Sequence, residues 1–242
     1  MLKLHYNLEK ISMGLVAAII VAASIGGLVE IAPLFTLDET VELPGDLRPN
    51  TPLELAGREI YMREGCYACH SQMVRSLADE IDRYGPYSLP SESAYDHPML
   101  WGSKRTGPDL ARVGGKYSDP WHVAHLIDPR AVVPASIMPA YPWLMEPLDT
   151  GNLGAELATL ARLGVPYTEE MATNAAADAL AQGNPDSDGA ADVATRYGEK
   201  VAIRAFDGDP ARLTEMDALV AYLQSLGTLT RTPNTELKDD NQ

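Results

Sequence analysis

The sequence predicts a mainly α-helical chain, with one membrane-spanning helix near its N-terminus followed by a single helical domain. Three observations predict this fold class. Residues 11–29 form an apolar run without a charge. Two later segments, which begin at Thr51 and Thr214, combine helix-start signals with apolar residues at helical spacing. No strand–helix–strand alternation surrounds the chain's two cysteines, Cys66 and Cys69.

Residues 11–29 are predicted to be a transmembrane anchor. These 19 residues come close to the roughly 20 that a helix needs to cross a hydrocarbon core. Two lysines precede the run, and the residues after it include acids but no base until Arg48. The positive-inside rule therefore places residues 1–10 in the cytoplasm and the rest of the chain outside. A cleaved signal peptide is the alternative, but the run is long for one and no obvious A-x-A site follows it.

The charge balance narrows the choice of partners. The chain has 34 acidic and 19 basic residues and a net charge of −15, and its first 30 residues contribute none of this excess. Nucleic acid is excluded as a partner, because binding it requires a basic face. An acidic surface would steer a basic protein toward the chain, although solubility alone also explains it.

Residues 30–51 contain prolines, a glycine and acids, and are predicted to form an extended linker. A helix is predicted over residues 52–64. Thr51 would be its N-cap, Pro52 would occupy the first helical position, and Glu54 stands at the capping-box position. This helix leads directly into the cysteine-containing segment.

A second strong helix is predicted from Thr214, with apolar residues at helical spacing up to Leu226 and with Gly227 as its stop. Together the two helices bound one domain, residues 52–228. Within it, residues from about 149 to 213 are predicted to be an acidic, alanine-rich insertion with some helix around 175–182. Residues 229–242 are predicted to be a polar tail.

Residues 66–70 read C-Y-A-C-H, the pattern to which a c-type haem is attached. Two thiols three residues apart can each form a thioether with one haem vinyl group, and His70 can then ligate the iron. A structural zinc site would need about four ligands, and the chain has no second cysteine pair. A thioredoxin-like site would lie near a βαβ pattern, and a structural disulfide gives His70 no role. We therefore predict an electron carrier with one covalent haem c, attached outside the cytoplasm.

Met138 is the predicted second axial ligand of the iron. It lies in S-I-M-P-A-Y-P-W, residues 136–143, where two prolines stiffen the backbone. Met145 is its main competitor, and His122 and His125 remain alternatives. A histidine–methionine pair would raise the iron's potential and fill both axial positions, which favours electron transfer over ligand binding.

Three further residues are candidates for the haem surroundings. Pro108, in G-P-D-L at 107–110, would accept a hydrogen bond from the second ring nitrogen of the axial histidine. A turn before a short helix fits the same four residues. Arg75 and Arg105 are candidate partners for the haem propionates, because a guanidinium group matches a carboxylate in geometry.

Several motifs together indicate a family. The anchor and acidic linker are followed by G-R-E-I-Y at 57–61, E-G-C-Y-A-C-H-S-Q-M-V-R at 64–75, W-G-S-K-R-T-G-P-D-L at 101–110 and M-P-A-Y-P-W at 138–143. In this order they closely resemble the membrane-anchored monohaem subunit (subunit II) of cbb3-type cytochrome c oxidases. The resemblance covers roughly residues 1–148 and resumes at 214–227.

The resemblance implies a class I-like cytochrome c domain on the periplasmic side of a bacterial inner membrane. Such a subunit lies beside a catalytic haem–copper subunit and a dihaem cytochrome c subunit. It takes part in electron flow from a soluble or anchored cytochrome c donor toward the low-spin haem b, where the catalytic subunit performs the oxygen chemistry. Residues 101–110 would face that subunit, and Ser103 would approach a shared calcium ion.

The residues alone leave two other functions open. The chain could be a stand-alone anchored cytochrome that serves another reductase, or a thiol–disulfide oxidoreductase without haem. The long motifs favour the oxidase subunit, because a lone electron shuttle does not need them.

Overall fold

The computed structural model describes residues 5–6, 9–35, 43 and 47–229, which form two units that divide after Glu42. In the first unit, α2 (Ser12–Ile31) continues into the short 3-10 helix η1 (Ala32–Phe35). Within Ser12–Leu34, a window of 18 residues has a mean hydropathy of 2.3 and is not buried, so by length and composition this stretch could cross a membrane. The helix extends beyond residue 29, and much of the predicted linker lies outside the described residues.

The second unit is built on α3 (Pro52–Arg63), whose start follows from its sequence. The Glu54 amide donates to Thr51 Oγ1 at 3.2 Å, and the Thr51 amide donates to Glu54 Oε2 at 2.9 Å. This reciprocal pair is the predicted capping box, with Pro52 in the first turn. Arg48 holds the same carboxylate with two hydrogen bonds of 2.7 and 2.8 Å.

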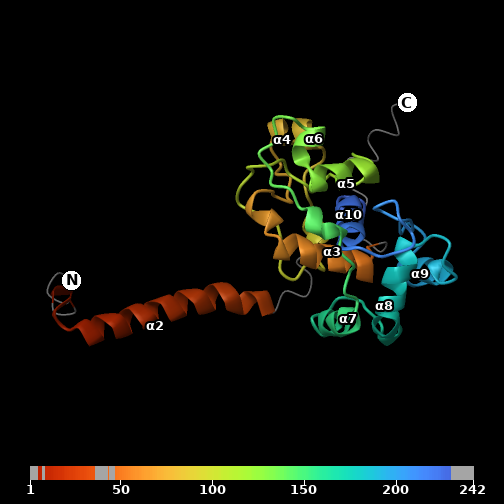
Figure 1. Cartoon of the computed structure of the whole chain (residues 1–242). Helices are drawn as coiled ribbons and strands as arrows, with labels where there is room; N and C mark the ends of the chain where they lie inside the picture. The colour runs from red at the N-terminus through yellow and green to blue at the C-terminus, as the bar shows by residue number, and fades with distance from the viewer. Residues whose placement is uncertain (1–4, 7–8, 36–42, 44–46, 230–242) are drawn as a thin grey trace, which may run out of the picture. The chain divides into compact units, whose positions relative to one another are not determined.

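The partner of α3 is α10 (Glu215–Ser225), which crosses it in the centre of the domain (Figure 1). Thr214 caps α10 as predicted. Tyr61 and Tyr222 meet edge to face at the crossing, with ring centroids 5.7 Å apart. Beyond α10, Gly227 has a φ of +76°, and a Cβ there would lie 2.5 Å from the Ala111 carbonyl oxygen.

The remaining helices gather at the two ends of the α3–α10 pair (Figure 1). One end holds α4 (Ala78–Tyr84), α5 (Asp119–Ile127) and α6 (Pro129–Val132); the other holds α7 (Leu153–Arg162), α8 (Glu169–Gly183) and α9 (Ala190–Tyr197). Three short 3-10 helices connect them: η2 (Cys66–Ala68), η3 (Pro90–Ser93) and η4 (Pro142–Met145). The described residues contain no β-strand, only an isolated bridge between Pro147 and Thr214. The mainly α prediction is confirmed.

Residues 149–213 contain α7, α8 and α9, and several of their side chains belong to the core. Leu157 of α7 and Ala179 of α8 are completely buried, and α8 packs on α3. The Tyr167 hydroxyl donates to the Asn50 carbonyl at 2.8 Å, which ties the segment to the residues just before α3. Sequence analysis predicted helix only around 175–182. It missed the extent of α8 because small alanine side chains give a weak periodic signal while still allowing close helix packing.

Candidate haem site

The C-Y-A-C-H segment forms one tight turn after α3. Gly65 has a φ of +71°, a conformation that glycine adopts without strain, and it leads into η2. The amides of Cys69 and His70 both donate to the Cys66 carbonyl, at 3.1 and 3.0 Å. The turn therefore places both thiols and the imidazole next to one another.

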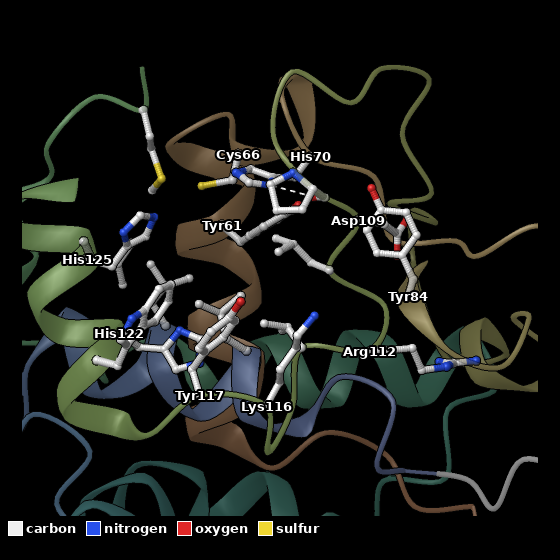
Figure 2. Close-up of a pocket in the computed structure, with 18 residues that line it drawn as sticks. Tyr61, Cys66, His70, Tyr84, Asp109, Arg112, Lys116, Tyr117, His122 and His125 are labelled. Atoms are coloured by element: carbon white, nitrogen blue, oxygen red, sulfur yellow. Dashed lines mark hydrogen bonds between the residues drawn. The ribbon is translucent and has the colours of Figure 1, made fainter. Parts of the chain in front are cut away.

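This turn borders a cavity that is partly open to solvent (Figure 2). Most of the lining is aromatic or aliphatic, and it comes from α3, α4, α5, α10 and the loops between them. The predicted site residues Cys66, His70, Pro108 and Met138 line it, together with Tyr61, Tyr84, Asp109, Leu110, Arg112, Val113, Lys116, Tyr117, Trp121, His122, His125, Leu126, Leu219 and Leu223.

His70 is held by the segment that sequence analysis singled out. Its Nδ1 lies 2.8 Å from the Pro108 carbonyl oxygen. Because a carbonyl oxygen only accepts, Nδ1 is protonated and donates a hydrogen bond to it. The Nε2 lone pair is then available to a metal ion. A Cβ at residue 107 would lie 2.3 Å from His70 Cε1, and the Gly107 amide donates to the Cys69 carbonyl at 2.9 Å. Glycine is required there because the ring packs on its backbone.

Met138 lines the cavity, whereas Met145, in η4, packs against the core outside it. The Met138 amide donates to Ser136 Oγ at 3.2 Å, which helps to fix the loop. Of these two methionines only Met138 borders the cavity, which favours Met138 as the axial ligand.

The two histidines of α5 also line the cavity. Tyr117, Trp121 and His125 stack in series, with centroid distances of 3.9 and 4.7 Å. Burial lowers the pKa of His122 to about 4 and also lowers the pKa of His125, which the nearby His70 lowers further. Both imidazoles are therefore neutral near pH 7, and both keep their place as alternatives to Met138.

Arg75 and Arg105 do not line this cavity. Both form ion pairs with the buried Glu80, Arg105 at 2.8 Å, and Arg105 also donates to Ser71 Oγ at 2.7 Å. These arginines, with Arg105 contributing most, hold the pKa of Glu80 below its ordinary value. Their pairing with haem propionates stays a prediction.

Lys116 lines the cavity, and sequence analysis missed it. Its Nζ lies 5.8 Å from the centroid of the Tyr117 ring, and it has no carboxylate partner in the described part of the chain. In the view of Figure 2, Lys116 and Tyr117 lie at the bottom of the cavity and Cys66 and His70 at the top. No motif surrounds this lysine, so only the fold reveals its position.

The environment of Cys66 does not suit thiol chemistry. Burial, and then the charge of Glu64, raise the pKa of the Cys66 thiol to about 11. Reactive cysteines in thiol–disulfide enzymes have lowered pKa values, because the thiolate is the nucleophile. Cys69 is exposed on the same turn and does not line the cavity.

Ser103 is exposed, beside the half-exposed Trp101 and the exposed Lys104. Among the residues that the structure describes, no group of three or more histidine, cysteine, aspartate or glutamate side chains could hold a metal ion. A calcium site at Ser103 stays a prediction.

Comparison with known proteins agrees with this site. The model of one protein family, described as "Cytochrome C oxidase, mono-heme subunit/FixO", matches residues 5–230. A search of curated proteins finds no match. Because the family model spans nearly the whole chain, including the anchor and the cavity, the chain belongs to the family of mono-haem (FixO) subunits of cytochrome c oxidase.

Proposed function

We propose that this chain is the electron-transfer subunit of a cbb3-type cytochrome c oxidase and holds one covalent haem c in the cavity beside Cys66. The observation that carries the proposal is the lining of that cavity. One thiol of the C-x-x-C-H motif, the imidazole of His70 and the thioether of Met138 all border the same apolar space. Imidazole and thioether are the axial ligands of a histidine–methionine cytochrome c, and the thiol is the group that attaches the haem.

The residues present fit such a group. Cys66 and Cys69 would bind it covalently, with His70 and Met138 as axial ligands. Pro108 fixes the tautomer and the direction of the His70 ring. Bound there, the haem supplies a one-electron redox couple. Lys116 is a stronger candidate than Arg75 or Arg105 for pairing with a propionate, because it lines the cavity without a carboxylate partner in the described residues.

The cavity walls suit electron transfer rather than oxygen chemistry. Two protein ligands would occupy both axial positions, and most of the cavity wall is aromatic or aliphatic. We propose that the oxygen chemistry takes place in the catalytic haem–copper subunit. This chain would receive single electrons from the dihaem cytochrome c subunit or a cytochrome c donor and pass them toward the low-spin haem b.

We further propose that the haem domain lies in the periplasm, with α2 anchoring it in the bacterial inner membrane and residues 1–10 in the cytoplasm. The charges flanking the apolar run support this orientation. The W-G-S-K-R-T-G-P-D-L segment would face the catalytic subunit, and Ser103 would approach a shared calcium ion there. The exposure of Trp101 and Ser103 leaves this segment accessible to a partner.

The test is a reduced-minus-oxidised visible spectrum of the complex that a tag on this chain recovers from detergent-solubilised membranes. We expect bands of both haem c and haem b. A C66A/C69A double variant should lose the haem c of this chain, which a haem stain of the denatured 26.2 kDa band would show directly. Haem c without haem b would favour a stand-alone cytochrome, and a wild-type chain without haem would overturn the proposal.

A further inference from the structure

Asp109 is a buried carboxylate that follows Pro108 and lines the same cavity. Its side chain is completely shielded from solvent. Both oxygens accept hydrogen bonds: Oδ2 from Ser71 Oγ at 2.6 Å and from the Met73 amide at 2.9 Å, and Oδ1 from the Ala111 amide at 2.8 Å. Burying a carboxylate is costly, and these hydrogen bonds offset part of that cost.

Ser71 and Met73, which donate to Asp109, belong to the segment that follows His70. Asp109 and Ala111 belong to the segment that follows Gly107, and the two segments meet at His70. Two backbone hydrogen bonds join these segments: the Gly107 amide donates to Cys69 at 2.9 Å, and the Leu110 amide donates to Ser71 at 2.8 Å. The contact of 2.8 Å between His70 and Pro108 lies between them. The Asp109 carboxylate adds side-chain bonds across the same junction. Figure 2 shows Asp109 and His70 as neighbours on one side of the cavity.

One cation faces this carboxylate. Arg105 lies 3.4 Å from Asp109 Oδ2, but it is also bound to Glu80 at 2.8 Å and to Ser71 Oγ. Its charge is therefore shared between two carboxylates. Glu80 also pairs with Arg75, so two arginines face these two carboxylates, and the charge of Asp109 lies one residue away from the carbonyl that holds the His70 ring.

We propose that Asp109 is a positioning residue that holds the Pro108 carbonyl on His70 and thereby sets the redox potential of the iron. The inference rests on the proposed haem function. A firm hydrogen bond from Nδ1 makes the imidazole a stronger donor to the metal, and a buried anion nearby favours the more positive oxidised state. Both effects lower the potential, so their loss should raise it.

The experiment is a redox titration of the full-length chain purified in detergent, comparing wild type with Asp109→Asn. Asparagine keeps the shape but has only one accepting oxygen, so its NH2 group must face either the Ala111 amide or the Ser71 and Met73 donors. We expect the midpoint potential to rise. The hyperfine-shifted haem methyl resonances of the oxidised protein should also move, because their pattern follows the orientation of the axial imidazole.

Asp178→Asn is the matched control. Asp178 is equally buried and paired with Arg196, but it lies in α8, outside the cavity. This variant should lose stability without a change in potential. Ser71→Ala removes only one hydrogen bond to Asp109, so it should raise the midpoint potential by less than Asp109→Asn does. It replaces Asp109→Asn in the titration if that variant does not fold.

A haem-bearing Asp109→Asn or Ser71→Ala chain with the wild-type potential would overturn the inference, and so would an equal rise in Asp178→Asn. These outcomes differ from failure of the proposed function, in which the wild-type chain would carry no haem to titrate.

Discussion

Gly57 of α3 lies directly against Ala218 of α10: a Cβ built at residue 57 would be 1.9 Å from the Ala218 carbonyl oxygen and 2.7 Å from Tyr222 Cβ. No rotation of a side chain relieves the first of these contacts, because the oxygen belongs to the backbone of a buried helix. The absence of a side chain at Gly57 thus allows the two helices to cross closely. That crossing carries Tyr61, which lines the haem cavity.

Gly57→Ala should therefore destabilise the domain, although alanine is the better helix former. Overpacking of a tight contact costs about 1–3 kcal/mol, which exceeds the gain in propensity of about 1 kcal/mol. Chemical denaturation followed by circular dichroism measures the change. Gly26→Ala in α2, where nothing lies within 4 Å of the added Cβ, is the control and should leave the domain's transition in place. Equal stability of the two variants would contradict the close crossing.

Gly107→Ala should disturb the axial histidine. The added Cβ would lie 2.3 Å from His70 Cε1, so the ring must move and its hydrogen bond to Pro108 must lengthen. We expect a smaller low-spin fraction of the haem in the visible and electron paramagnetic resonance spectra. Thr106→Ala, at an exposed neighbouring position, should keep the wild-type spectra. A fully low-spin, unshifted Gly107→Ala spectrum would show that His70 is not held as the structure describes.

Met138→Ala should open the iron to external ligands. Removal of the thioether leaves an axial position vacant, so the reduced variant should bind carbon monoxide and its midpoint potential should fall. Met145→Ala is the matched control, because Met145 lies outside the cavity. Carbon monoxide binding to Met145→Ala but not to Met138→Ala would reverse the assignment.

His122 and His125 also line the cavity, so the same experiment needs variants of these two histidines. If His125 takes the place of Met138 in Met138→Ala, the haem will stay six-coordinate and only the double variant with His125→Ala will bind carbon monoxide. His122→Ala in the same background distinguishes the two imidazoles, which lie three residues apart on α5. If the double variant Met138→Ala/His125→Ala does not bind carbon monoxide, His122 is the remaining candidate ligand.

Local signals were enough to predict the two central helices. Thr51 with Glu54 and Thr214 with Asp217 form capping boxes, and each is a pattern of four adjacent residues. The contact between His70 and Pro108 was also predictable, because the G-P-D-L motif accompanies C-x-x-C-H in single-haem cytochromes. Lys116 was not, since its place at the cavity depends on how the loop after Val113 folds back onto α10, where the Gly114 amide donates to Leu226 at 3.2 Å.

The helix content of residues 149–213 was the main difference between prediction and structure, and the packing of this segment can be tested with two leucines. Leu157 of α7 is completely buried, whereas Leu163, which ends the same helix, is 57% exposed. Leu157→Ala should lower the free energy of unfolding by about 2–5 kcal/mol, because it removes buried methyl groups and leaves a cavity. Leu163→Ala should change it by less than about 0.5 kcal/mol. Urea denaturation monitored in the far ultraviolet gives both values. If residues 149–213 were an independent appendage, Leu157→Ala would instead add a separate early transition and leave the main one, which reports α3 and α10, unchanged.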